Sequence, residues 1–341
     1  MLGRKTIDKK NILVFGGAGF IGSHLCQALL REGNVVCVDN FITGKEKNID
    51  SLLRNYNFEF VRHDVTKPID FLESLVELDK FKVKVQGFQE IYHLACPSLP
   101  RRFSELAIEI LMANALGTKN ILDAVLKYQA KFIFVSSSVV YGKAPDSQPH
   151  IDENYMGVSD PLRGRSCYFE GKRFAESLIN NYRMKFQLDT KIVRVFTTYG
   201  PRMRFSDGRT VSTFVWHALE GKDLVIYGNQ NLKSSYCYVD DIIQGLLKLA
   251  KSKESGPINL GNDVEVKIID VAEKVIKMLN SRSKIVFKEP ETYYIFSPIP
   301  DITLARERLG WSPVYLLDAG LKKTVDYLKA SRSLVGFSDS E

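Results

Sequence analysis

The sequence has little of what marks a membrane, secreted or metal-binding protein. The apolar run that follows its basic first ten residues, Ile12–Phe15, is too short for a signal peptide or a membrane span. Its five cysteines are scattered, without the paired spacing of a metal site or the density of a disulfide framework. It has no internal repeat and no low-complexity segment. We therefore expect a cytoplasmic protein that has no membrane, metal or disulfide requirement.

Positive charge is in excess but is not concentrated. The 47 lysines and arginines are interleaved with 40 acidic residues, which gives a formal net charge of +7 without any basic tract. A solvated basic surface that attracts an anionic substrate accounts for this pattern better than a nucleic-acid partner does. We expect no nucleic-acid partner.

Short apolar runs alternate with helical patterns over roughly the first 200 residues. Such runs, bounded by turn residues, are typical of buried parallel strands. The predicted strands are 11–15, 34–38, 58–61, 90–94, 131–135 and 191–195, and the predicted helices are 20–33, 106–116, 118–128 and 168–186. The alternation predicts a Rossmann-type α/β fold, a doubly wound parallel sheet covered on both faces.

The regular alternation of strands and helices ends at Tyr199-Gly200-Pro201, after which the loops are longer. We predict a smaller C-terminal α/β lobe from this point. Its predicted strands are 224–227, 257–260 and 285–288, and its predicted helices are 210–220, 240–251 and 268–279. We therefore predict a dinucleotide-binding domain at 1–199, an interleaved substrate lobe at 200–330 and a disordered tail at 331–341.

A glycine-rich turn joins the first predicted strand to the first helix. Gly16, Gly19 and Gly22 have the spacing of a dinucleotide-binding turn, in which the glycines allow a tight bend and a close approach to a pyrophosphate. The next strand ends at Asp39, whose carboxylate would accept hydrogen bonds from a ribose and repel a 2′-phosphate. These features predict NAD rather than NADP as cofactor.

A second motif predicts acid–base chemistry. Tyr168 and Lys172 are four residues apart, so a helix places them on one face, where the ammonium group favours the phenolate. A tyrosine in that state can take a proton from a substrate hydroxyl. Ser137 follows the fifth strand, at the sheet edge where ligands bind, and can hydrogen-bond the same substrate oxygen. We predict these three residues to be catalytic.

Together these motifs resemble the extended short-chain dehydrogenase/reductase family of NAD-dependent nucleotide-sugar epimerases, dehydratases and decarboxylases. The resemblance runs from about residue 10 to 313 and is closest to UDP-glucuronate decarboxylases. The residues that carry it include His63-Asp64-Val65, Tyr92–Pro97, Val140-Tyr141-Gly142, Cys167-Tyr168, Glu170–Arg173, Gly200–Met203, Asp207-Gly208-Arg209, Asn259–Asn262 and Pro300-Asp301-Ile302.

The resemblance implies oxidation of the sugar at C4 by NAD, with Tyr168 as the base. In decarboxylases the C6 carboxylate then leaves as carbon dioxide, and the hydride is returned. The implied contacts of the cofactor are Gly16, Gly19, Phe20, Ile21, Gly22, Asp39, Asn40, Asp64, Val65, Leu94, Ala95, Tyr168 and Lys172. The implied contacts of the nucleotide sugar, a UDP-sugar by this resemblance, are Thr197, Arg209, Val225 and Tyr227. A homodimer built from the helices near 106–128 and 168–186 is also implied.

Several positions depart from the decarboxylase pattern. Val139 stands where decarboxylases and dehydratases carry a catalytic glutamate, and Ser138 where dehydratases carry an aspartate. Ser234 replaces an arginine, Thr197 replaces an asparagine, and the segment before Pro300-Asp301 lacks an arginine. A nucleotide-sugar 4-epimerase or 4-keto reductase, which needs no second acid–base group, is therefore an alternative. A non-catalytic NAD sensor or RNA-binding relative is an alternative of another class.

Overall fold

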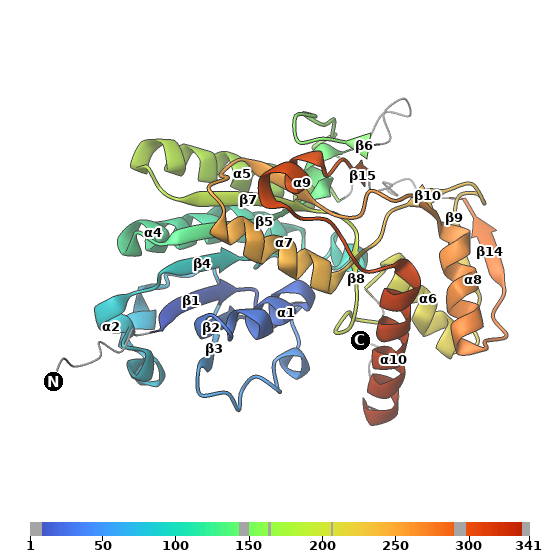
Figure 1. Cartoon of the computed structure of the whole chain (residues 1–341), viewed down its shortest axis with the longest axis horizontal. Helices are drawn as coiled ribbons and strands as arrows, with labels where there is room; N and C mark the ends of the chain where they lie inside the picture. Colours follow the sequence, from blue (N-terminus) through green and yellow to red (C-terminus); the bar gives the residue numbers. More distant parts are fainter. Residues whose placement is uncertain (1–8, 143–149, 163–164, 206, 290–297, 336–341) are drawn as a thin grey trace. The chain divides into compact units, whose positions relative to one another are not determined.

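The computed structural model describes residues 9–142, 150–162, 165–205, 207–289 and 298–335. Its largest sheet has seven parallel strands (Figure 1). Their spatial order is β12 (Pro257–Leu260), β7 (Thr190–Val195), β5 (Lys131–Ser137), β4 (Glu90–His93), β1 (Lys10–Phe15), β2 (Gly33–Asp39) and β3 (Phe58–Arg62). The order reverses at β1, whose neighbours are β2 and β4, and ligands of such sheets bind at this reversal. The predicted doubly wound fold is confirmed.

The central strands are buried because they are apolar on both faces. Every residue of β1 after Lys10 is buried, and β2 is buried apart from Asn34. All six strands predicted for the first half of the chain are present. The strand predicted at 257–260 with the C-terminal lobe is also a member of the large sheet. It pairs in parallel with β7, from Pro257↔Ile192 to Leu260↔Val195, and completes the large sheet.

Inter-residue contacts divide the chain into two compact units. Unit 1 is 1–96, 112–134 and 177–190, and unit 2 is 97–111, 135–176 and 191–341. The predicted boundary at 199 remains a prediction, but the grouping places the segments around Ser137 and Tyr168 in one unit with the C-terminal part of the chain.

Unit 1 holds β1 to β4 and the helices that connect them. The helical segments are α1 (Phe20–Leu29), η1 (Glu46–Asn48), η2 (Asp70–Ser74), η3 (Val76–Phe81), α2 (Val83–Gln86), η5 (Ala113–Gly117) and α4 (Thr118–Tyr128). The helices predicted at 106–116 and 118–128 run on from one to the other, because the π-helical turn η5 connects α3 (Ala107–Met112) to α4. The predicted first helix ends at Leu29 rather than Gly33, because Gly33 already begins β2.

Unit 2 contains the remaining strands of the large sheet, several helices and small two-stranded sheets. Its helical segments are η4 (Pro100–Arg102), η6 (Ser138–Tyr141), α5 (Ser166–Phe186, entering unit 1 at Ser177), α6 (Thr210–Leu219), α7 (Val239–Lys251), α8 (Ile268–Leu279), α9 (Thr303–Leu309) and α10 (Leu317–Val335). The paired short strands are β6 (His150–Ile151) with β15 (Ile299–Pro300), β8 (Thr198–Tyr199) with β11 (Cys237–Tyr238), β9 (Leu224–Tyr227) with β14 (Ile285–Lys288), and β10 (Lys233–Ser234) with β13 (Val266–Lys267).

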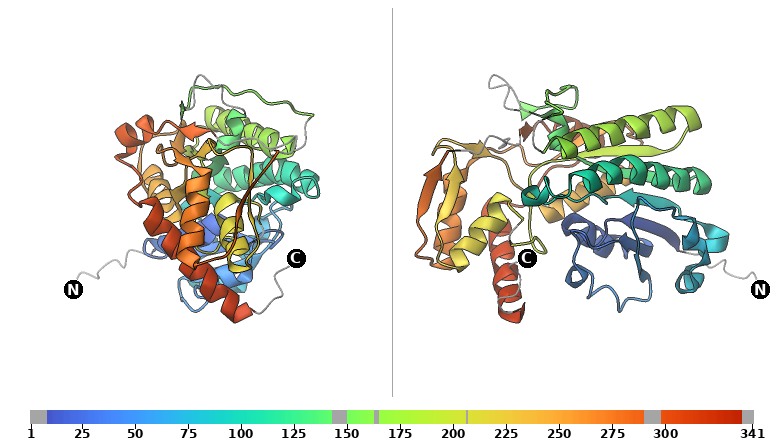
Figure 2. Two further views of the ribbon diagram at one scale, coloured as in Figure 1. Left: turned by 90° about the vertical axis from the view of Figure 1, so that its right-hand side faces the viewer. Right: turned by 180° about the vertical axis from the view of Figure 1, so that it is seen from behind.

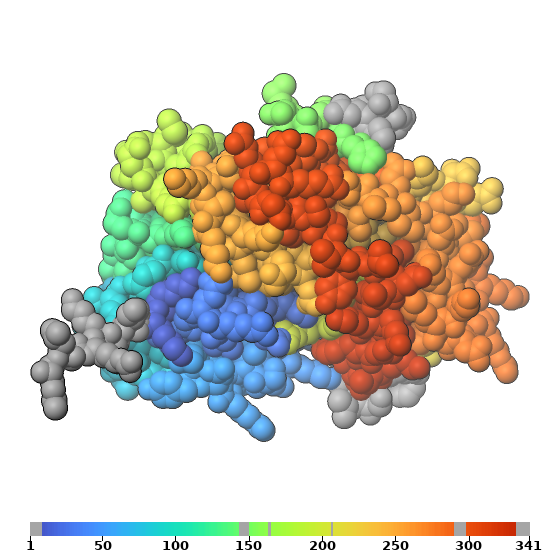
Figure 3. Space-filling view, viewed as in Figure 1, coloured from blue at the N-terminus to red at the C-terminus, as the bar shows by residue number. Residues whose placement is uncertain are grey.

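The C-terminal helices of unit 2 form a local layer. Helices α6, α8 and α10 contact one another, and α6 and α8 also contact β9 (Figure 2). In the space-filling view, residues of α10 (red) lie at the surface beside the orange residues around α8 (Figure 3). The tail predicted from Ser331 overlaps α10, which continues to Val335, and residues 336–341 lie outside the described part of the chain. Within the described residues, no helix is long and apolar enough to cross a membrane.

Candidate active site

The glycine turn of unit 1 has the close packing that a dinucleotide-binding turn requires. Gly16 has a φ of +80°, and a Cβ there would lie 2.6 Å from the backbone nitrogen of Ala95. A Cβ at Gly22 would overlap the carbonyl oxygen of Gly16. Gly19 caps α1 without a side chain over the helix N-terminus, whose N–H groups suit a phosphate. The turn thus brings the ends of β1 and β4 to the start of α1.

Asp39 shapes this turn as well as marking the end of β2. Its Oδ2 accepts a hydrogen bond from the backbone nitrogen of Ala18 at 3.0 Å, and its Oδ1 accepts one from Phe41 at 2.9 Å. Burial raises the pKa of the Asp39 carboxyl, and these backbone hydrogen bonds only partly offset it. A carboxylate oxygen accepts more than one hydrogen bond, so the same group can hold the turn and still face a ribose.

The other predicted cofactor residues of unit 1 adjoin these elements. Asp64 accepts hydrogen bonds from the Thr66 nitrogen at 2.9 Å and hydroxyl at 2.8 Å, and from the side chain of Asn40. Burial acts to raise the pKa of Asp64, but these hydrogen bonds outweigh it and the pKa is lowered. Val65 is buried against Gly117 of η5, while Phe20 and Ile21 begin α1.

The three predicted catalytic residues all belong to unit 2. Lys172 is only 2% exposed, and its Nζ donates to the carbonyl oxygen of Val135 at 3.0 Å. That nitrogen lies 6.0 Å from the centre of the Tyr168 ring. Because Val135 is two residues from Ser137 on β5, this hydrogen bond anchors the tyrosine–lysine face of α5 at the strand end that carries the serine.

Tyr168 is half-buried and has an aromatic partner. Its ring stacks on Phe103, with 5.0 Å between ring centres and 23° between planes. The Ser137 hydroxyl accepts a long 3.4 Å hydrogen bond from the Val139 nitrogen. The stack on Phe103 orients the plane of the Tyr168 phenol.

A polar network that sequence reasoning missed joins α5 to β5, β7, η6 and β12. Glu176, one helical turn after Lys172, accepts a hydrogen bond from the Ser136 hydroxyl at 2.5 Å. Arg194 of β7 makes a bidentate contact with Glu176, at 3.1 and 2.8 Å, and donates to the Tyr141 hydroxyl at 3.0 Å. Tyr141 in turn donates to Asn259 of β12 at 2.6 Å. The only signal in the sequence was the four-residue spacing from Lys172 to Glu176.

Comparison with protein families decides the family. Residues 12–261 match the NAD-dependent epimerase/dehydratase family. The chain belongs to this family. It is therefore an NAD-dependent nucleotide-sugar enzyme, which confirms the prediction made from the motifs.

Individual relatives agree with this assignment. The chain is 38% identical over 323 residues to UDP-glucuronic acid decarboxylase 1 of Xenopus tropicalis, covering 94% of this chain and 73% of the relative. It is 40% identical over 311 residues to UDP-glucuronic acid decarboxylase 4 of Arabidopsis thaliana, covering 91% and 66%. A solved structure of UDP-glucuronic acid 4-epimerase from Bacillus cereus, in complex with UDP-glucuronic acid and NAD, matches with a TM-score of 0.79 at 30% identity, covering 94% and 99%.

The predicted substrate residues of this epimerase-family chain lie on several elements of unit 2. Arg209 precedes α6, and its guanidinium donates to Asp207 and to the Ser98 carbonyl oxygen, each at 2.7 Å. Val225 and Tyr227 are half-buried in β9, which α6 contacts. Thr197 is half-buried after β7, and its carbonyl oxygen accepts a hydrogen bond from Cys237 at 2.9 Å.

Val139 and Ser234, two positions that depart from the decarboxylase pattern, also lie in unit 2. Val139 is half-buried in η6, between Ser138 and Tyr141. Ser234 pairs with Val266 in the short β10–β13 ladder. Among the described residues, no group of three or more potential ligands is arranged to hold a metal ion.

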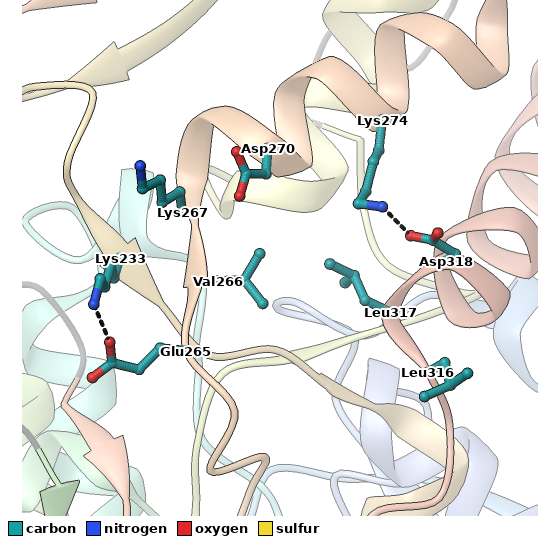
Figure 4. Close-up of a pocket in the computed structure, with 9 residues that line it drawn as sticks. All are labelled: Lys233, Glu265, Val266, Lys267, Asp270, Lys274, Leu316, Leu317 and Asp318. Atoms are coloured by element: carbon teal, nitrogen blue, oxygen red, sulfur yellow. Dashed lines mark hydrogen bonds and ion pairs between the residues drawn. The ribbon is translucent and has the colours of Figure 1, made fainter.

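A separate pocket of about 720 Å³ opens between the β10–β13 pair, α8 and the start of α10 (Figure 4). Four of its charged side chains form ion pairs with one another. Lys233 pairs with Glu265 and Lys274 with Asp318, each at 2.6 Å. None of the predicted catalytic, cofactor or substrate residues lines it.

Proposed function

We propose that this enzyme oxidises C4 of UDP-glucuronate, using NAD held at the Gly16–Gly22 turn. The arrangement of Ser137, Tyr168 and Lys172 at the end of β5 carries the proposal. The substrate is inferred from relatives, since both the decarboxylases and the solved 4-epimerase carry UDP-glucuronic acid in their names.

In this proposal each catalytic side chain has one task. Lys172 stabilises the phenolate form of Tyr168, which takes the proton of the C4 hydroxyl and becomes a neutral phenol. The Ser137 hydroxyl hydrogen-bonds the C4 oxygen. Bound NAD supplies a hydride acceptor that gives the hydride back at the end of the cycle. Phe103 keeps the Tyr168 ring in one plane and shields one face of it from water.

Decarboxylation is the proposed next step. Oxidation places a ketone at C4, β to the C6 carboxylate. The bond between C5 and C6 then breaks, its electron pair enters an enolate and carbon dioxide departs. A proton from solvent at C5, the returned hydride at C4 and the return of the Tyr168 proton to the C4 oxygen complete a UDP-pentose.

A UDP-glucuronate 4-epimerase is the second candidate, and Val139 favours it. The residue is apolar and cannot serve as an acid or a base, whereas epimerisation needs only the tyrosine, the lysine and rotation of the ketone. Two carboxylates of unit 2 are engaged by other groups, Glu176 by Arg194 and Glu153 by the backbone nitrogen of Asn259.

The product distinguishes the two reactions. We expect purified enzyme to convert UDP-glucuronate to a UDP-pentose with one carbon dioxide per sugar and no net reduction of NAD. Conversion to UDP-galacturonate without carbon dioxide would establish the epimerase instead. If nuclear magnetic resonance detects no conversion of UDP-glucuronate, the proposed substrate is wrong.

We also propose a cytoplasmic homodimer. Apolar side chains are exposed on two helices, including Ile108 of α3, at 67%, and Phe174 of α5, at 52%. Exposed apolar groups on a soluble enzyme favour burial against a second copy. Light scattering should give twice the chain mass for the native enzyme and a lower mass for Ile108→Glu; a native mass of one chain would refute the dimer.

A further inference from the structure

The geometry points to Arg101 as the residue that binds an anionic group of the sugar nucleotide, either a phosphate or the sugar carboxylate. This inference rests on the proposed function, because it assigns a recognition residue to the same substrate. Arg101 belongs to η4, a short 3-10 helix in unit 2.

The segment around Arg101 connects the catalytic tyrosine to the loop before α6. At one end, the Ser98 carbonyl oxygen accepts a hydrogen bond from Arg209. At the other end, Phe103 stacks on Tyr168. Arg101 lies between these two anchored positions, two residues from Phe103, and consecutive Cα atoms are about 3.8 Å apart. The Cα of Arg101 is therefore close in the chain both to Phe103, which contacts Tyr168, and to Ser98, which contacts the loop before α6.

The stem of Arg101 packs against the backbone at Gly208. This glycine has a φ of +85°, and a Cβ built on it would lie 2.9 Å from Cγ of Arg101 and 3.5 Å from both Cδ and Nε. The absence of a side chain at Gly208 thus lets the arginine stem lie directly over the loop backbone. A side chain packed in this way has less conformational entropy to lose when it binds a ligand.

Two arginines close to Arg101, namely Arg102 in the same segment and Arg209, already have acidic partners. Arg209 is neutralised by Asp207, at 2.7 Å, and Arg102 by Glu105, at 2.5 Å. Arg101 is exposed, and within the described residues its guanidinium has neither an ion-pair nor a hydrogen-bond partner. It is therefore the positive charge of this segment that remains available to an incoming anion.

Guanidinium groups bind both phosphates and carboxylates with paired hydrogen bonds. UDP-glucuronate offers both chemistries, since it carries a diphosphate and a C6 carboxylate. UDP-glucose carries the same diphosphate without the carboxylate. Comparing the two ligands therefore identifies which group Arg101 binds.

The test is Arg101→Gln, which removes the charge and keeps most of the side-chain length. Its matched control is Arg102→Gln, the adjacent arginine, which already pairs with Glu105. Isothermal titration of NAD-loaded enzyme with UDP-glucuronate should show a Kd roughly 10- to 100-fold higher for Arg101→Gln and nearly unchanged for Arg102→Gln. The NAD affinity of both variants should match that of the native enzyme.

The ligand comparison assigns the anion. Equal weakening of UDP-glucuronate and UDP-glucose would identify a phosphate as the group bound, and weakening of UDP-glucuronate alone would identify the carboxylate. Native affinity of Arg101→Gln for both ligands, or equal weakening by Arg102→Gln, would overturn the inference while leaving the proposed function standing. If the native enzyme binds neither UDP-sugar, both the proposed function and the inference are wrong.

Discussion

Tyr168→Phe should lower the kcat for UDP-glucuronate by about 100- to 10,000-fold, the usual contribution of a positioned acid–base group. Phenylalanine keeps the ring that stacks on Phe103 and removes only the hydroxyl. Without it, no side chain takes the C4 proton, so oxidation becomes the slow step. NAD affinity should stay within about twofold of native, since the removed group acts on the sugar proton.

The matched control is Tyr315→Phe. Tyr315 is also half-buried in unit 2, but its hydroxyl accepts a hydrogen bond from Lys323, at 3.1 Å, on α10. Steady-state turnover and the absorbance of reduced nicotinamide should be native in this control. If Tyr168→Phe keeps more than about half of native turnover, Tyr168 is not the base.

The second large effect is on stability. Arg194→Met removes the two hydrogen bonds that Arg194 donates to the Glu176 carboxylate. Of the partners in the network, only the Ser136 hydroxyl then still donates to Glu176. Breaking a buried ion pair costs about 3–5 kcal/mol. The side chains of Arg194 and Glu176 keep 14% and 13% exposure, so we expect the lower end, about 3 kcal/mol.

Urea unfolding of the NAD-free protein measures this cost, with Arg306→Met as the control. Arg306 pairs with Asp263 at a more exposed position, where the two side chains are 46% and 28% exposed, respectively. Its loss should therefore cost less than about 1 kcal/mol. Adding Glu176→Leu to Arg194→Met should recover part of the stability, because it removes the unpaired charge. Equal costs for Arg194→Met and Arg306→Met would show that the network does not stabilise the fold.

The sequence predicted the parts of the structure that depend on local pattern. The six strands of the first half follow from short apolar runs, and the glycine turn from the spacing of Gly16, Gly19 and Gly22. The contact between Tyr168 and Lys172 follows from their four-residue helical spacing.

What the sequence did not predict depends on tertiary pairing. The strand at 257–260 joins β7 after a long intervening segment, and nothing in its four residues specifies that partner. The Glu176–Arg194 contact joins residues on different elements. Arg209 was predicted as a substrate ligand, whereas the structure shows that its charge is already balanced by Asp207. Its role with the substrate remains a prediction.

Deuterium transfer tests the central claim, C4 oxidation by NAD, most directly. UDP-glucuronate deuterated at C4 is mixed with a stoichiometric amount of NAD-loaded enzyme, and the quenched mixture is analysed by mass spectrometry. The account predicts that deuterium appears in the nicotinamide during turnover and that the deuterated sugar reacts more slowly than the protiated one. Turnover at an unchanged rate, with no deuterium in the cofactor at any time, would contradict it.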